Sequence, residues 1–242
     1  MADYDGTIAP LGVTRAESRI LGDVEVQLKR ISRQIPVCIV TAKDYEFIHT
    51  RASFADGWAC VGGLDVRVGG RSFLEKNLRD MTPALEKVES IARQGVIAEL
   101  KRGPRGEVIG LAVDWTGSSR KGPEVVRRLT PLKRMGFHVV HDPSATYADV
   151  YSAPPSKGKA TKLLKSLLNV RGNVMFIGDS KQDNTAFRAS GLSVGVAHGQ
   201  PVGVLRCEYI VDQSRLAGFL RSLADRGMDF SPSITWVRRK EG

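Results

Sequence analysis

Short apolar runs alternate with amphipathic segments over most of this chain, and this alternation limits the possible folds more than any other feature. The runs are a few residues long and rich in β-branched side chains, which is typical of buried strands. They lie at residues 36–41, 173–178 and 192–196. The amphipathic segments carry apolar residues three and four positions apart, as helices that cover a sheet do. They lie at residues 17–34, 157–168 and 215–225. This order predicts an α/β fold with a doubly wound, Rossmann-like parallel sheet.

The middle of the chain, from about residue 73 to 152, has a different pattern. Thr82-Pro83 predicts the start of a helix that runs to about residue 94, because threonine caps helices and proline suits the first helical position. The loop Gly103-Pro104-Arg105-Gly106 has the composition of a hairpin turn. The other expected elements are strands 96–102 and 107–115, a helix at 124–135, and strands 137–141 and 148–152. We therefore predict a smaller inserted α+β domain of order αββαββ at 73–152, between core segments 1–72 and 153–242.

The composition is that of a soluble globular protein, with 42% hydrophobic and 26% charged residues. No apolar run reaches the ~20 residues that span a bilayer. Asp3 and Asp5 leave no room for a signal peptide, so we expect a cytoplasmic protein with no membrane partner. The three cysteines are far apart and fit neither a disulfide framework nor a zinc site, so we expect reduced thiols.

The net charge of +10 could attract polyanions. Lysine and arginine are dispersed along the chain, and only residues 237–240 form a basic run. We interpret the charge as a solvated basic surface and expect a monomer without a nucleic-acid partner. A basic nucleic-acid-binding protein remains the alternative of another class, and DNA affinity that falls steeply with salt would favour it.

Two carboxylates close to the start carry the first chemical signal. Asp3-Tyr4-Asp5-Gly6-Thr7 is expected at the carboxyl end of the first core strand, where open α/β sheets bind ligands. A turn at Gly6 can move Asp5 out of strand geometry, so the two carboxylates can take different roles. One can attack phosphorus while the other protonates the leaving alkoxide and then activates water. The alternative interpretation is an acidic turn without a chemical role.

A second acidic motif, Gly178-Asp179-Ser180-Lys181-Gln182-Asp183, directly follows an apolar strand. Its carboxylates are expected at the same sheet edge as Asp3, and oxygen ligands of this kind suit Mg²⁺. A metal is also chemically required, because it lets an anionic nucleophile approach an anionic phosphate. Taken alone, Asp179 and Asp183 could instead cap a helix.

Thr41 ends one predicted strand, and Lys157 begins a predicted helix. A hydroxyl and an ammonium at such positions can donate hydrogen bonds to phosphoryl oxygens as charge builds in a transition state. Each signal is weak alone.

In order and spacing, the four motifs resemble those of the haloacid dehalogenase superfamily. The resemblance implies a phosphatase in which Asp3 is the nucleophile that becomes phosphorylated and Asp5 is the acid and base. It implies further catalytic roles for Thr41 and Lys157. The implied Mg²⁺ ligands are Asp3, the backbone carbonyl of Asp5, Asp179 and Asp183.

The inserted domain resembles the type IIB cap of sugar phosphatases in this superfamily, and most of all that of trehalose-6-phosphate phosphatases. The supporting motifs are Glu99-Leu100-Lys101, Lys157-Gly158-Lys159-Ala160 and Asp183-Asn184-Thr185-Ala186-Phe187. Some positions depart from the family. Thr41-Ala42-Lys43 replaces the usual Thr-Gly-Arg, and Gly62-Gly63 replaces the common Asn-Gly pair. Asp149 replaces a usual glutamate, and Asp114-Trp115 replaces a histidine-aromatic pair.

Strand alternation in the inserted domain predicts which residues contact a substrate. If Arg102 pairs with Glu107, then Glu99 lies opposite Gly110 and Lys101 opposite Val108. One face is then apolar, with members Val96, Ala98, Leu100, Ile109, Leu111 and Val113. The other presents Glu99, Lys101 and Asp114 beside the small residues Gly110 and Ala112, and the family pattern adds Asp149. We predict that these four polar residues bind sugar hydroxyls; a solvated face is the alternative.

The sequence therefore predicts a Mg²⁺-dependent phosphomonoesterase that acts on a small-molecule sugar phosphate. Trehalose 6-phosphate is the first choice of substrate. Mannosyl-3-phosphoglycerate and sucrose 6-phosphate, substrates of related type IIB enzymes, are the alternatives, and a catalytically weak sugar-phosphate sensor is a further one.

Overall fold

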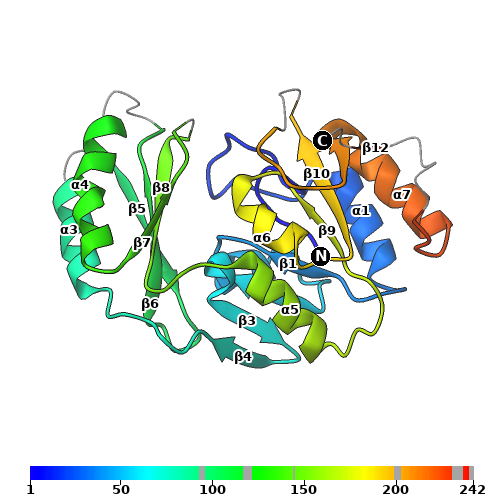
Figure 1. Ribbon diagram of the computed structural model, residues 1–242, viewed down its shortest axis with the longest axis horizontal. Helices are drawn as coiled ribbons and strands as arrows, with labels where there is room; N and C mark the ends of the chain where they lie inside the picture. The colour runs from blue at the N-terminus through cyan, green and yellow to red at the C-terminus, as the bar shows by residue number, and fades with distance from the viewer. Residues whose placement is uncertain (93–95, 117–121, 144, 199–202, 231–236, 240–242) are drawn as a thin grey trace.

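The computed structural model describes residues 1–92, 96–116, 122–143, 145–198, 203–230 and 237–239. It has two lobes (Figure 1). The larger lobe, the core, contains the elements before residue 75 and after residue 152. The smaller lobe, the cap, contains the elements between residues 82 and 151. Among the described residues, no helix is both long and apolar enough to cross a membrane.

The first half of the core sheet comes from residues that precede the cap. β1 (Cys38–Val40) pairs in parallel with β2 (Gly57–Cys60). The sheet then continues in antiparallel fashion through β3 (Asp65–Val68) and β4 (Arg71–Leu74). Gly69 and Gly70 have φ angles of +55° and +74° in the turn between β3 and β4, where left-handed backbone lets a two-residue hairpin close.

The second half comes from residues that follow the cap. β9 (Met175–Gly178), β10 (Leu192–Ala197) and β11 (Tyr209–Asp212) are parallel. β12 (Arg238–Arg239) adds an antiparallel edge strand. The prediction of an α/β core with a parallel sheet is confirmed.

A single residue, Ala2, joins the two halves of the sheet. It forms parallel bridges to Ile39 of β1 and Ile177 of β9. Its backbone N–H donates to the carbonyl of Cys38 at 3.0 Å, and its own carbonyl accepts from the N–H of Val40 at 2.9 Å. The first core strand is thus very short, yet it occupies the centre of the sheet and ends directly at Asp3.

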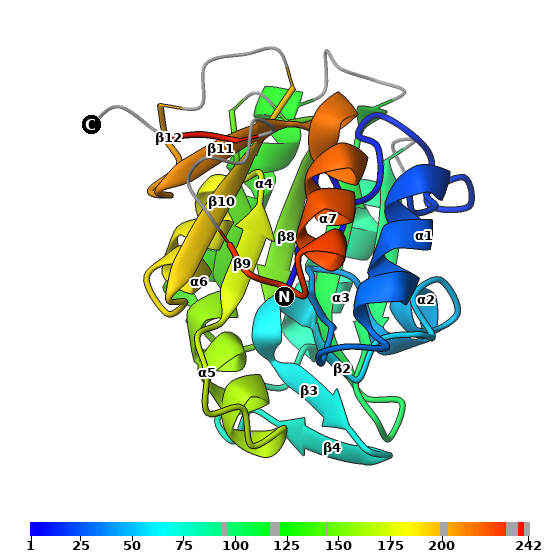
Figure 2. The ribbon, with the colours of Figure 1, turned by 90° about the vertical axis from the view of Figure 1, so that its right-hand side faces the viewer.

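Helices cover both faces of the core sheet. α1 (Gly22–Ile31) and α7 (Leu216–Asp225) pack side by side on one face, which Figure 2 shows from the front, and α2 (Tyr45–His49) adds to the same apolar cluster. α5 (Lys157–Leu167) and α6 (Asn184–Phe187) cover the other face. Side chains of β1 alternate between the two clusters, as they do in any strand buried on both sides.

The predicted helix at 17–34 is wrong at its start, because helix α1 begins only at Gly22. The preceding residues bond to other segments instead of to one another. The backbone carbonyl of Ser18 accepts a hydrogen bond from the Arg51 guanidinium, and the N–H of Leu21 donates to the carbonyl of Ile8. These bonds keep residues 18–21 in an irregular loop beside the first motif.

The cap has the predicted order αββαββ. Its two helices lie on the side away from the core, and its sheet faces the core (Figure 1). The sheet is antiparallel, with strand order β5-β6-β8-β7. The elements are α3 (Thr82–Ala92), β5 (Ile97–Arg102), β6 (Val108–Asp114), α4 (Gly122–Arg134), β7 (His138–His141) and β8 (Tyr147–Tyr151). The predicted end of the first helix, at about residue 94, lies outside the described residues.

The predicted register of the cap hairpin is wrong by two residues. Lys101 pairs with Gly110, and Glu99 pairs with Ala112. Because side chains alternate between the two faces of a strand, a shift of two residues keeps Glu99 and Lys101 on the predicted face. One residue of the error comes from the turn, because Arg102 pairs with Val108 instead of Glu107. The other comes from a bulge, which leaves Ile109 as an extra residue. Ile109 was expected among the cap's apolar residues, but the bulge turns it into the core cluster instead.

Candidate active site

Asp3 lies at the carboxyl end of the central Ala2 strand and is buried. One of its carboxylate oxygens, Oδ1, accepts from the backbone N–H of Tyr4 at 2.7 Å. The other, Oδ2, lies 2.8 Å from Nζ of Lys157. The same ammonium lies 2.7 Å from Oδ1 of Asp183. Lys157 therefore bridges the carboxylates of the first and last predicted motifs.

Asp3, Asp179 and Asp183 form an acidic cluster, with one oxygen of each within 4.8 Å of the others. An all-oxygen donor set fits Mg²⁺ well. Asp183 belongs to a 3₁₀ turn, η3 (Lys181–Asp183), and its oxygens already accept hydrogen bonds from Lys157 and from the two residues Asp179 and Ser180. Asp3 and Asp179 have fewer protein donors, so they have more capacity to bind a metal directly.

The electrostatics of the cluster reflect its burial. Removal from water raises the pKa of Asp3 well above its usual range, the charges of Asp183 and Asp179 raise it further, and Lys157 opposes the shift. Burial lowers the pKa of Lys157, yet the two carboxylates beside it more than reverse this and raise the pKa above its ordinary value. The ammonium therefore stays charged, and the site has one fixed cation against three carboxyl groups.

Asp5 points away from this cluster. Its carboxylate accepts from the Ser18 hydroxyl at 3.3 Å and lies 3.5 Å from Nζ of Lys43, and its side chain is 34% exposed. The turn at Gly6, where φ is +75°, produces this separation. A Cβ at Gly6 would lie only 2.1 Å from Oδ2 of Asp179, so only glycine lets the loop approach that carboxylate. The structure thus gives Asp3 and Asp5 different environments, as predicted for two different roles.

Thr41 is buried at the end of β1, and its hydroxyl accepts from the backbone N–H of Lys43 at 3.1 Å. This bond closes the turn that carries Lys43 to Asp5. Lys43 occupies the position at which the family pattern has arginine. It provides a cation next to the outward-facing carboxylate.

The structure separates the four predicted substrate-binding residues into three settings. Lys101 and Asp149 form a buried ion pair of 2.5 Å, and Asp149 also accepts from the Tyr151 hydroxyl at 3.1 Å. Glu99 instead accepts from Arg15, a core residue. Asp114 lies at the end of β6, where its carboxylate accepts from both the backbone and the hydroxyl of Thr116. Only Lys101 and Asp149 are therefore brought together.

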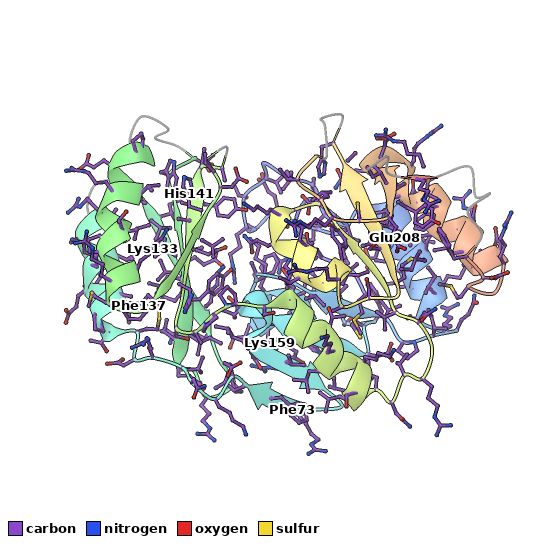
Figure 3. The ribbon with its side chains drawn as sticks, in the orientation of Figure 1. Phe73, Lys133, Phe137, His141, Lys159 and Glu208 are labelled. Atoms are coloured by element: carbon purple, nitrogen blue, oxygen red, sulfur yellow. The ribbon has the colours of Figure 1, made fainter. Side chains whose placement is uncertain are left out.

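Several residues at the site were not predicted from the sequence. Tyr147 lies on the same face of β8 as Asp149 and Tyr151. Its pKa is raised above the ordinary value by desolvation and by the charges of Asp149, Asp5, Asp3 and Asp179. Figure 3 shows side chains of both lobes entering the space between them.

Two further residues lie at the ends of core strands. His198 follows β10, with Nε2 3.5 Å from Oδ2 of Asp179, and this contact is the main reason that its pKa is raised. Gln213 follows β11 and donates to carbonyls of the loop after Asp5. The only sequence signal for His198 was its position soon after a predicted strand, which many polar residues share, and β11 before Gln213 was not predicted.

Comparisons with known proteins agree with this geometry. Residues 127–223 match the family model of haloacid dehalogenase-like hydrolases. This segment includes Lys157 and the acidic cluster's Asp179 and Asp183. This part of the chain is similar to haloacid dehalogenase-like hydrolases.

Solved structures with the haloacid dehalogenase-like fold extend the likeness to the cap. A trehalose-6-phosphate phosphatase related protein superposes with a TM-score of 0.71 at 17% identity, covering 93% of this chain and 96% of that chain. The C-terminal domain of C. albicans trehalose-6-phosphate phosphatase gives 0.72 at 15% identity, with 93% and 90% covered. A subclass IIB sugar phosphatase of the superfamily gives 0.63 at 15% identity, with 94% and 98% covered. At these identities the likeness shows the fold alone.

A curated relative is more similar in sequence over a shorter stretch. The phosphoglycolate phosphatase of Sulfurisphaera tokodaii is 37% identical over 68 residues, which cover 28% of this chain and 30% of the relative. The match therefore spans less than a third of that relative's length.

Proposed function

We propose that this haloacid dehalogenase-like protein is a Mg²⁺-dependent phosphomonoesterase with Asp3 as its nucleophile. The observation that carries the proposal is the arrangement of Asp3, Lys157, Asp179 and Asp183 at the carboxyl edge of the sheet, with Asp5 held apart by the turn at Gly6. Asp3 supplies the nucleophile, Lys157 a fixed cation, and the aspartates of the cluster supply oxygen ligands. Asp5 supplies a carboxyl group outside the acidic cluster that can transfer protons.

The reaction follows from these positions. A carboxylate oxygen of Asp3 attacks phosphorus, and the bond to the leaving oxygen breaks as Asp5 gives that oxygen a proton. Water then attacks the aspartyl phosphate while Asp5 takes its proton, which releases phosphate and restores Asp3. Lys157 orients Asp3 and offsets its charge. Asp3 and Asp179, with Asp183 beside them, would hold Mg²⁺, which supplies neutralisation of the two anions that must meet.

The substrate that we propose is a sugar phosphate, with trehalose 6-phosphate as first choice. The support is the cap sheet, where Lys101, Asp149, Tyr147 and Tyr151 gather on one face. Hydroxyl and charged groups on one face suit a ligand with many hydroxyls. Mannosyl-3-phosphoglycerate and sucrose 6-phosphate have the same chemistry and belong in the same test.

Phosphate release from a panel of sugar phosphates, measured with and without Mg²⁺, tests the proposal. We expect turnover that EDTA removes and Mg²⁺ restores. Asp3→Asn should keep the fold, as judged by circular dichroism, and lose turnover, because the amide has no attacking anion. A folded Asp3→Asn variant with more than a few per cent of wild-type activity would show that the nucleophile is another residue.

The role of the cap is tested separately with Lys101→Ala and Glu99→Ala. If these residues bind the sugar, kcat/KM for the sugar phosphate should fall by about tenfold or more, or about 1.4 kcal/mol. Turnover of p-nitrophenyl phosphate, which is too small to reach the cap, should change little. Equal losses on both substrates would indicate damage to folding or cap closure.

A further inference from the structure

The side chain of Gln213 holds the hairpin that carries Asp5. Its amide nitrogen, Nε2, lies 3.2 Å from the carbonyl oxygen of Gly6, 3.2 Å from that of Thr7 and 3.1 Å from that of Ala9. Gln213 begins the 3₁₀ turn η4 (Gln213–Arg215) directly after β11. One side chain, more than 200 positions away in sequence, therefore contacts three carbonyl groups of the same short loop.

The loop is a compact hairpin. The N–H of Gly6 donates to the carbonyl of Ala9 at 2.9 Å, and Asp5 forms a bridge with Ala9. The carbonyl of Tyr4 accepts from the N–H groups of Thr7, Ile8 and Ala9. The inward N–H groups of the hairpin are thus satisfied within it. The Ala9 carbonyl accepts from Gln213 in addition to Gly6, and the carbonyls of Gly6 and Thr7 also accept from Gln213.

Asp179 holds the opposite side of the hairpin. Its carboxylate accepts from the Thr7 hydroxyl at 3.0 Å and occupies the space that a side chain at Gly6 would need. The hairpin is therefore fixed between the end of β9 and the end of β11. Asp5 emerges from it with the Ser18 hydroxyl 3.3 Å and Nζ of Lys43 3.5 Å from its carboxylate.

We propose that Gln213 is a positioning residue for proton transfer by Asp5. It fixes the hairpin backbone, and the hairpin backbone sets where the Asp5 carboxyl group meets the leaving oxygen. This inference rests on the proposed phosphatase function. Gln213 lies outside the four motifs, yet protonation of the leaving group depends on it.

The test compares two substrates that differ in how much they need an acid. An alkoxide leaving group, as in trehalose 6-phosphate, must be protonated as it departs, whereas p-nitrophenolate departs as an anion. We expect Gln213→Leu to lower kcat/KM at least tenfold for trehalose 6-phosphate and less than about threefold for p-nitrophenyl phosphate, since general acid catalysis contributes ~10²-fold or more. Equal losses on the two substrates would overturn the proposal.

Two further variants test whether the effect of Gln213 depends on its hydrogen-bond donor rather than its size, and whether it acts through Asp5. Gln213→Glu keeps the size of the side chain but replaces the donor by an anion at pH 7.5, so it should behave as Gln213→Leu does; wild-type kinetics would overturn the proposal. In an Asp5→Ala background, Gln213→Leu should cause no further loss on trehalose 6-phosphate. Gln34→Leu is the matched control, because that glutamine is exposed and its amide donates to the carbonyl of Ala224 at 3.5 Å.

Hydrogen exchange provides a readout without catalysis. Backbone amides of residues 4–10 should exchange faster in Gln213→Leu than in the wild type, and those of α5 should not change. Unchanged exchange in the hairpin would overturn the proposal. A wild-type protein that releases phosphate from neither substrate would instead contradict the proposed function, and the exchange result would still decide whether Gln213 fixes the hairpin.

Discussion

Arg15 of the core donates a hydrogen bond to Glu99 of the cap while its other terminal nitrogen lies 2.7 Å from Asp44 of the core. Its guanidinium also lies over the Phe47 ring, with the carbon 4.5 Å from the ring centroid. One side chain thus connects the loop after the first motif, the helix α2 and the cap sheet. Glu99 was predicted to bind sugar, but in this arrangement it is bound by the core.

A double-mutant cycle distinguishes these two roles of Glu99. We expect Arg15→Ala and Glu99→Ala to lower kcat/KM for the sugar phosphate by similar factors, and the double variant to be no worse than either. The coupling energy should be about 1 kcal/mol, as for other contacting pairs. Losses that multiply would mean that Glu99 acts on the substrate independently of Arg15. Arg30→Ala is the control. It removes an exposed ion pair with Asp225 on the surface of the larger lobe and should leave kcat/KM unchanged.

The buried pair of Lys101 and Asp149 should matter for stability as well as for substrate binding. Lys101→Ala leaves the Asp149 carboxylate buried without a cation, so we expect urea denaturation to show a loss of about 3 kcal/mol. Lys101→Met combined with Asp149→Asn should recover most of that loss, because no charge remains and the new amide oxygen can still accept from Tyr151. Lys29→Ala removes an exposed pair and should cost less than about 0.5 kcal/mol. Equal costs for the two lysines would contradict the buried pair.

Gly6 and Gly12 offer a matched test of the contact between the first and last motifs. Both have positive φ, +75° and +73°, so alanine costs about 1 kcal/mol of backbone strain at either position. Only at Gly6 would the new Cβ collide, 2.1 Å from the Asp179 carboxylate, whereas at Gly12 it would meet nothing within 4 Å. We expect Gly6→Ala to lose phosphatase activity and Gly12→Ala to keep it. Similar activity in both variants would show that the collision is relieved by movement of the loop.

Metal binding should release a proton, because the pKa of Asp3 is raised by burial and by Asp183 and Asp179. With a folded-state pKa above the unfolded value, the contribution of Asp3 to stability without metal is present at low pH and lost as pH rises through the folded pKa. Affinity for Mg²⁺ should change in the opposite sense and increase with pH. Calorimetry in two buffers of different ionisation enthalpy measures the released proton. Asp3→Asn should abolish the release, and identical heats in the two buffers would contradict this assignment.

Much of the fold could be predicted because local patterns and packing agree. The helix at Lys157 and the strand before Gly178 combine clear periodicity with clear boundaries, and both lie within one or two residues of their predicted limits. The strands β2, β3 and β4 were missed. They are four residues each, which is too short for a clear alternation, and their one strong sequence signal is the Gly69-Gly70 turn.

The site divides in the same way. Only the family pattern implied that Asp3 and Lys157 belong to one site, since nothing in the spacing of two residues so far apart indicates contact, and their ion pair was not predicted. The role of Ile109 could not be predicted, because a bulge changes the alternation on which face assignments depend. Arg15 and Gln213 act through side chains in irregular segments, where no periodicity exists to indicate direction.

The central position of Ala2 has a consequence for the order in which the protein forms during translation. The N–H of Asp3 donates to the carbonyl of Ile177, and the amino group of Met1 donates to the carbonyl of Met175, 174 positions later. The strand that ends at Asp3 can therefore pair on only one side until β9 has been synthesised. The cap, whose contacts are local, is synthesised before that moment and can fold first. The surroundings of Asp3 are then completed late, when β9 leaves the ribosomal exit tunnel and pairs with Ala2 and Asp3.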